Sequence, residues 1–204
     1  MSNHVKIILM NLSLISLLLS NFLVIILAIV QKWDTSTVLL VYWIQSIIIG
    51  FFQFLRILSL KKFSTENFKI NNQPALPTTK TKLFTAFFFM FHYGFFHFIY
   101  AIFLFNFFTN QSVDFTYLFL GGLIFFMNHT FSYFHNRIVD QEGTQNIGHL
   151  MFAPYARIIP MHLIIIFGAL LGQSALVMFL LLKTLADLLL HHLKHKTNYS
   201  LNLK

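Results

Sequence analysis

Residues 83–108 read LFTAFFFMFHYGFFHFIYAIFLFNFF and contain no Asp, Glu, Lys or Arg. As a helix, this stretch would be about 39 Å long at 1.5 Å per residue. The hydrocarbon core of a bilayer is about 30 Å thick, so such a helix is long enough to cross it. The sequence therefore predicts a membrane-spanning helix over this stretch.

The composition of the whole chain also favours a membrane protein. Hydrophobic residues make up 57% of its 204 residues, charged residues only 10%, and the mean hydropathy is +0.71. A soluble domain usually has about 25% charged residues. The lipid bilayer is therefore the expected partner, and any activity must take place within the membrane or at its faces.

Apolar stretches of similar length recur along the chain. The predicted spans are residues 5–30, 36–60, 83–108, 115–134, 154–171 and 174–193. The last two belong to one apolar run, which Gly172-Gln173-Ser174 divides into a hairpin. Two longer polar stretches, residues 61–82 and 135–153, are expected to be cytoplasmic loops. We therefore predict one all-α domain over residues 1–204, a polytopic transmembrane bundle of about six helices.

The basic residues are distributed unevenly between the two sides of this predicted bundle. If both termini lie on one side, that side has Lys6, Lys61, Lys62, Lys69, Lys80, Lys82, Arg137, Lys194, Lys196 and Lys204. The opposite side has only Lys32, so the positive-inside rule places both termini in the cytoplasm. This topology accounts for the net charge of +8, and nucleic acid is not an expected partner. Richness in Phe, Ile, Asn and Lys is typical of an AT-rich bacterial genome, so we expect a bacterial cytoplasmic membrane.

Several ionisable side chains lie inside predicted spans, where each costs at least about 2.5–3.5 kcal/mol at the helix centre. Counted from the cytoplasmic ends, four of them lie roughly 10–14 Å deep at 1.5 Å per residue. These four are His92, His129, His162 and Asp187, each on a different span. We expect them to face a shared interior site that opens to the cytoplasm.

This layer has the chemistry of a metal site. The chain has no cysteine, so a metal would need His, Asp, Glu or backbone oxygen as ligands. Imidazoles with one carboxylate suit Zn²⁺, our first expectation, and also Fe²⁺, Mn²⁺ or Cu²⁺. The candidate ligands are His92, His129, His162 and Asp187, with His191 and His97 as alternates. A metal with an open position could support hydrolysis or redox chemistry, which would make the protein a membrane enzyme.

Two other functions stay open. Histidine titrates near neutral pH and Asp/His chains relay protons, so a proton-coupled transporter or channel would use the same residues. Alternatively, the polar side chains only hydrogen-bond between helices, each contributing about 0.6 kcal/mol, in a non-catalytic structural subunit. A further polar stripe in span 36–60 consists of Tyr42, Gln45, Gln53 and Arg56. The sequence is silent on the substrate, small molecule or lipid, and on the oligomeric state.

Several short motifs in the spans are distinctive. They are Tyr42-Trp43-Ile44-Gln45-Ser46, Ile49-Gly50-Phe51-Phe52, His92-Tyr93-Gly94, Phe131-Ser132 with Asn136, Pro154-Tyr155 through Arg157-Ile158 to Met161-His162, and Lys183 with Asp187 through His191. On these motifs, the chain resembles an uncharacterised family of small multi-pass membrane proteins from bacteria and archaea, over about Trp33 to His191. The resemblance implies no activity, but it favours a single site formed by His92, His162, Asp187 and His191. The family often has Glu where this chain has Gln45, which puts in question a carboxylate role in the second span.

Overall fold

The computed structural model of the protein describes residues 15, 19–107, 113–156, 158–159, 163 and 182–186. The chain is mostly helical, at 77%, and forms two compact units, Met1–Pro154 and Tyr155–Lys204. Nearly all described residues belong to the first unit, which we call the bundle. The predicted spans 154–171 and 174–193 lie almost wholly outside the described residues, as does the N-terminal half of span 5–30.

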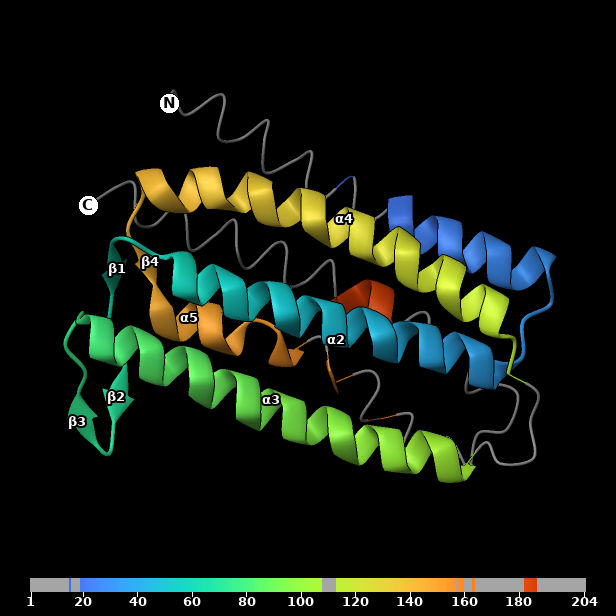
Figure 1. The fold of residues 1–204 in the computed structure, drawn as a ribbon, viewed down its shortest axis with the longest axis horizontal. Helices are drawn as coiled ribbons and strands as arrows, with labels where there is room; N and C mark the ends of the chain where they lie inside the picture. Colours follow the sequence, from blue (N-terminus) through green and yellow to red (C-terminus); the bar gives the residue numbers. More distant parts are fainter. Residues whose placement is uncertain are drawn as a thin grey trace. The chain divides into compact units, whose positions relative to one another are not determined.

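Helix α2 (Thr35–Ser59) is the centre of the bundle. It packs against α3 (Thr79–Phe107) on one side and against α4 (Phe115–Glu142) on another. The three helices lie side by side in Figure 1, with the ends of α2 and α4 that come first in the chain at the same end of the bundle. The side chains that α2 buries between these neighbours form the core of the bundle.

Two of these helices are long and apolar enough to cross a membrane, over Ser36–Ser59 and Thr79–Phe105. These segments agree with the predicted spans 36–60 and 83–108. A shorter apolar helix, Leu19–Val30, precedes them. In the part of the chain that the structure describes, two candidate spans are therefore seen where the sequence predicts about six over the full length.

Helix α4 runs past the expected end of its span. The sequence predicts a span over residues 115–134 and a loop over 135–153, but α4 continues to Glu142 and a short helix, α5 (Ile147–Phe152), follows. No Gly or Pro occurs in α4 after its apolar part until Gly143, so no residue interrupts the helix. Polar residues after position 134 mark the end of the apolar run, but they do not end the helix, which continues to Glu142.

Glycines allow α2 to approach both of its neighbours closely. A Cβ atom at Gly50 of α2 would lie 2.5 Å from Cε1 of Tyr93, and one at Gly121 of α4 would lie 2.6 Å from Cγ1 of Val41. Any larger residue would push the helices apart at these two points. Small residues at such contacts are typical of helix packing within membranes.

The outer face of the bundle is apolar and rich in phenylalanine. On α3, for example, Phe91 is 71% exposed and Phe98 is 63% exposed. Soluble monomers rarely expose large continuous apolar surfaces. An outer surface of this kind is expected where helices face lipid tails, which agrees with the apolar length of α2 and α3.

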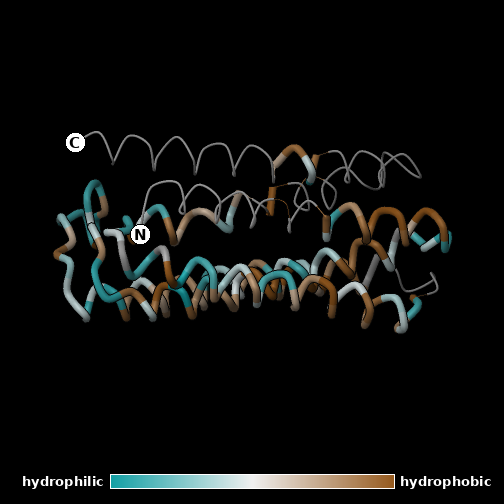
Figure 2. Tube along the Cα trace, turned by 90° about the horizontal axis from the view of Figure 1, so that it is seen from above, coloured by the Kyte–Doolittle hydropathy of each residue, from teal (hydrophilic) through white to brown (hydrophobic). Residues whose placement is uncertain are grey.

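Short strands close one end of the bundle. Strand β1 (Phe63–Ser64) pairs in parallel with β4 (Gln145–Asn146), and β2 (Lys69–Ile70) pairs antiparallel with β3 (Gln73–Pro74). Because β1 and β4 come from the two expected cytoplasmic loops, these loops lie at the same end of the bundle (Figure 1). The loop segments at this end, on the left of Figure 2, are mainly hydrophilic. In the described ranges, these two-residue strands are the departure from the all-α prediction.

Candidate functional site

A buried histidine on α3 is hydrogen-bonded to a serine on α2. Nε2 of His97 lies 2.8 Å from Oγ of Ser46, and the two residues are 4% and 7% exposed. The other ring nitrogen of His97, Nδ1, lies 2.8 Å from the carbonyl oxygen of Tyr93, one helical turn earlier. Both nitrogens of this imidazole are therefore held in place between two apolar helices.

The backbone carbonyl of Tyr93 determines which nitrogen of His97 carries hydrogen. A carbonyl oxygen can only accept a hydrogen bond, so Nδ1 of His97 must be the donor in that contact. In the neutral ring, Nε2 is then an acceptor, and the hydroxyl of Ser46 donates to it. The geometry thus assigns the Nδ1–H tautomer to neutral His97.

Tyr93 completes the network from α3. Its hydroxyl lies 2.9 Å from Oγ of Ser46 and donates to the carbonyl oxygen of Ser46 at 3.0 Å. Its ring stacks on the imidazole of His97, with ring centroids 4.3 Å apart. Gly50 leaves the space that this ring occupies, and Trp43 Nε1 donates to the carbonyl oxygen of His97 at 3.1 Å.

This network can take up one additional proton, which supplies the hydrogen that one of its four contacts lacks when His97 is neutral. When His97 is neutral, the hydroxyl of Ser46 donates to Nε2, and the contact between the Ser46 and Tyr93 hydroxyls has no hydrogen. When His97 is protonated at both nitrogens, Nε2 donates to Oγ of Ser46, and the Ser46 hydroxyl turns to donate to the hydroxyl of Tyr93. In both states Tyr93 donates to the Ser46 carbonyl and Nδ1 donates to the Tyr93 carbonyl. A single hydroxyl rotation therefore separates the two protonation states.

Polar side chains also lie on the other side of α2, at the same height. Gln45, the neighbour of Ser46 in the chain, is 1% exposed, and its Nε2 donates to Oδ1 of Asn21 at 3.4 Å. Nearby in helix Leu19–Val30, Oγ of Ser20 accepts a hydrogen bond from Nδ2 of Asn128 on α4 at 2.5 Å. We call the side chains of these two groups the polar layer, which consists of Ser20, Asn21, Gln45, Ser46, Tyr93, His97 and Asn128.

The polar layer crosses the bundle near the middle of α2. Ser46 lies about 17 Å from Thr35 and about 20 Å from Ser59 along the helix axis, at 1.5 Å per residue. If α2 crosses a membrane, the layer lies close to the middle of the bilayer. It is therefore deeper than the layer of roughly 10–14 Å that the sequence predicts from the spacing of histidines and Asp187.

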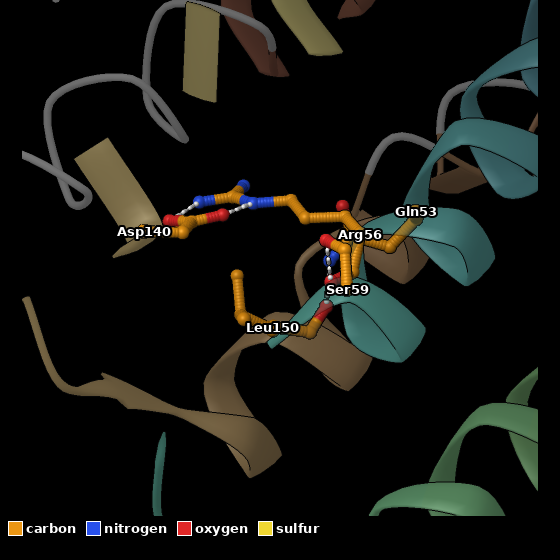
Figure 3. A network of polar contacts seen from close by, with 5 residues as sticks. All are labelled: Gln53, Arg56, Ser59, Asp140 and Leu150. Atoms are coloured by element: carbon orange, nitrogen blue, oxygen red, sulfur yellow. Dashed lines mark hydrogen bonds and ion pairs between the residues drawn. The ribbon is translucent and has the colours of Figure 1, made fainter. Parts of the chain in front are cut away.

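A second polar contact lies at the end of the bundle that carries the strands (Figure 3). Nε of Arg56 lies 2.5 Å from Oδ2 of Asp140, and Nη2 of Arg56 lies 2.7 Å from Oδ1. The two side chains are 12% and 3% exposed. Gln53, close by on α2, donates from Nε2 to the carbonyl oxygen of Leu150 at 2.7 Å. These contacts connect α2 to both α4 and α5.

The predicted metal ligands that the structure describes differ in burial and in their neighbours. His97 belongs to the polar layer, and His129 is buried on α4, next in the chain to Asn128. His92, by contrast, is exposed on α3 and stacks on Phe88, with ring centroids 5.2 Å apart. The two histidines of α3 therefore do not share a face.

Among the described residues, no group of three or more His, Cys, Asp or Glu side chains is placed to hold a metal ion. The other predicted ligands, His162, Asp187 and His191, lie outside the described residues. The proposed convergence of four spans on one metal therefore stays a prediction. In the described residues, both ring nitrogens of His97 are engaged in hydrogen bonds.

Sequence reasoning did not assign a role to Ser46, Tyr93 or Asp140. The signal for Asp140 was present, because His129, Ser132 and Asn136 form a stripe at helical spacing that continues at Asp140. It was missed because residue 140 was assigned to a loop. Ser46 and Tyr93 are small or amphipathic residues that often occur in apolar helices, so only the three-dimensional contact with His97 distinguishes them.

Comparison with known proteins adds a family but no activity. A protein-family model that is described as a family of unknown function matches residues 6–201 of the chain. No curated protein and no solved structure matches the chain. The function must therefore be argued from the geometry of the polar layer.

Proposed function

Because this chain belongs to DUF6498, a family of unknown function, its relatives name no activity, and we propose one from the geometry of the site. The protein is a multi-pass protein of a prokaryotic cytoplasmic membrane that handles protons, as a proton-coupled transporter or channel. His97 is the group that takes up and releases the proton. Ser46 and Tyr93 are the positioning residues that accommodate both protonation states of its ring.

The membrane location is supported by the apolar length of two helices and by the exposed phenylalanines of α3. It is also supported by the hydrophilic loops gathered at one end of the bundle (Figure 2). The proposed arrangement has six spans with both termini in the cytoplasm, because nine of the ten basic residues outside the predicted spans lie on that side, as does Lys6 at the start of the first span. With this orientation, the end with the strands and the Arg56–Asp140 ion pair faces the cytoplasm.

The observation that carries the proposal is the hydrogen bonding of His97. Histidine is the side chain whose ordinary pKa lies nearest to neutral pH, and here its ring is held near the middle of a helix that could span a bilayer. Its hydrogen-bond partners in the described bundle are a hydroxyl and a carbonyl, with no carboxylate among them. A carboxylate would stabilise the imidazolium and retain the proton, whereas these neutral partners allow the proton to leave.

The same contacts would also serve a purely structural role. Hydrogen bonds between membrane helices contribute about 0.6 kcal/mol on average and can simply hold α2 against α3. The two functions differ in what happens when the ring is replaced by an amide. Glutamine can donate and accept hydrogen bonds but does not titrate. It can therefore keep a hydrogen bond between α2 and α3, but it cannot relay a proton.

Proton flux into proteoliposomes distinguishes the two functions. The protein is reconstituted with an internal pH-sensitive dye, and a potassium gradient with valinomycin supplies the driving force. We expect wild-type flux well above that of empty vesicles, and at least a tenfold loss in His97→Gln. The control is His92→Gln, since His92 is an exposed histidine on the same helix, and its flux should equal that of the wild type.

Two results would contradict the proposal. One is wild-type flux equal to that of empty liposomes at every pH and driving force tested. The other is undiminished flux in a His97→Gln protein that is folded, as judged by its circular dichroism and its elution from a sizing column. A Ser46→Ala variant adds a graded measurement, because it removes the acceptor for Nε2–H and should lower flux without abolishing it.

A further inference from the structure

The loop between α2 and α3 carries a set of exposed lysines. Three lysines of this loop, Lys61, Lys62 and Lys69, are exposed, and a fourth exposed lysine, Lys80, lies in the first turn of α3. A fifth, Lys82, is partly buried and donates to the carbonyl oxygen of Leu60 at 2.9 Å. The loop contains one acidic residue, Glu66. We call the four exposed lysines and the segment that holds them the basic loop.

The fold keeps the basic loop close to the ends of two apolar helices. It begins where α2 ends and returns to the start of α3, so both of its ends lie where those helices would leave the bilayer (Figure 1). Within it, strands β2 and β3 form a hairpin whose turn residues, Asn71 and Asn72, have positive φ of 51° and 62°. Asparagine tolerates this conformation, which is typical of tight two-residue hairpin turns. The lysines are thus carried on an ordered structure.

An apolar side chain stands out among these lysines. Leu76 follows strand β3, lies between Ala75 and Pro77, and is 70% exposed. An exposed leucine in the same short loop as several exposed lysines suits the boundary between headgroups and acyl chains, where the charges meet phosphate and the apolar group enters the lipid.

We propose that the basic loop is a docking surface for anionic phospholipid headgroups of the leaflet from which α2 and α3 emerge. The lysines contact the headgroup phosphates, and Leu76 enters the upper acyl region. Charge complementarity selects anionic over zwitterionic lipid, since each lysine near an anionic surface contributes to the attraction. The inference rests on the membrane location proposed above and is independent of proton transport.

The absence of cysteine from the sequence allows a direct test. A single Leu76→Cys substitution is labelled with the environment-sensitive dye NBD, and the full chain is reconstituted in vesicles of phosphatidylcholine alone or with phosphatidylglycerol. We expect a blue shift and increased emission only with phosphatidylglycerol, reversed by high salt. Replacement of the four exposed lysines by Gln should remove the shift. The association of the basic loop with the anionic lipid surface should weaken about fivefold for each lysine replaced.

The matched control replaces the same four lysines by Arg, which keeps the charge and should keep the shift. Equal emission in both lipid compositions, or a shift that survives the four Lys→Gln changes, would overturn the proposal. Binding of a short RNA oligonucleotide to the detergent-solubilised protein, with no response to phosphatidylglycerol, would assign the basic loop to nucleic acid instead. A protein that conducts no protons would still give the expected shift, so this result is separable from the failure of the proposed function.

Discussion

Arg56 on α2 and Asp140 on α4 form a two-point ion pair in which Nε and Nη2 each face one carboxylate oxygen, at 2.5 and 2.7 Å. Asp140 is 3% exposed, so its charge depends on this arginine for compensation. The pair connects the C-terminal part of α2 to the C-terminal part of α4. Gln53 and Leu150 extend the connection to α5.

Removal of one member of this pair should destabilise the bundle more than removal of both. Arg56→Gln leaves a buried carboxylate without its partner and should lower the free energy of unfolding by about 3 kcal/mol. The double variant Arg56→Gln/Asp140→Asn removes both charges and should recover at least half of that loss. Unfolding by SDS in mixed micelles, followed by circular dichroism, measures the difference. Equal, additive losses would show that the two side chains do not interact.

Gly50 and Gly94 provide a matched pair of glycine-to-alanine changes. A Cβ at Gly50 would lie 2.5 Å from the ring of Tyr93, whereas one at Gly94 would have no atom within 4 Å. Gly50→Ala should therefore cost about 1–3 kcal/mol and disturb the Ser46–Tyr93 contact. Gly94→Ala should be neutral or stabilising by up to about 1 kcal/mol, because alanine favours a helix. Thermal unfolding in the same detergent compares them, and equal effects would contradict the close approach of α2 and α3.

The hydrogen bond between Asn128 and Ser20 should contribute to the packing of helix Leu19–Val30 on α4. A double-mutant cycle with Asn128→Ala and Ser20→Ala should give a coupling energy of about 0.6 kcal/mol, and at most about 1.7 kcal/mol. The free energies of unfolding of all four proteins supply the cycle. A coupling energy of zero would mean that the two side chains do not meet.

Single cysteines test the orientation of the chain. Lys62 lies in the basic loop and Asp34 precedes α2 at its other end, and both residues are exposed. In intact cells, Asp34→Cys should react with a membrane-impermeant maleimide, and Lys62→Cys should react only after the membrane is opened. Labelling of both residues from outside would contradict a span between them, and the reverse pattern would invert the topology.

The apolar pattern of the sequence was sufficient to predict α2 and α3. Their bounds agree to within a few residues with the predicted spans 36–60 and 83–108, because an apolar run of this length is expected to be helical throughout if it crosses a bilayer. The chain belongs to a family of unknown function, which confirms that part of the prediction, whereas the multi-pass membrane character of the family stays a prediction. The extension of α4 was not predicted, since hydropathy detects the apolar part of a helix and not its polar continuation. The pairing of β1 with β4 depends on contacts between distant segments that no local pattern contains.

The candidate site was predicted only in part, and helical geometry explains why. His92 and His97 lie five residues apart, about 140° around the helix, so only one of them can face α2. The residue that shares the inner face with His97 is Tyr93, one turn earlier. The depth of a residue in the membrane does not show which side of the helix it lies on, so depth alone could not distinguish His92 from His97. The role of Ser46 could not be predicted either, because it depends on which helix lies opposite.

Nitrogen-15 NMR of histidine side chains in lipid bilayers tests the protonation of His97 most directly. The signal of His97 is identified by its loss in the His97→Gln variant, and the pH is varied between about 4 and 9. The account predicts a neutral Nδ1–H tautomer at high pH, set by the Tyr93 carbonyl, and full conversion to imidazolium at low pH. A ring that keeps one neutral form over the whole range would contradict it, and His97 would then only hold α2 and α3 together.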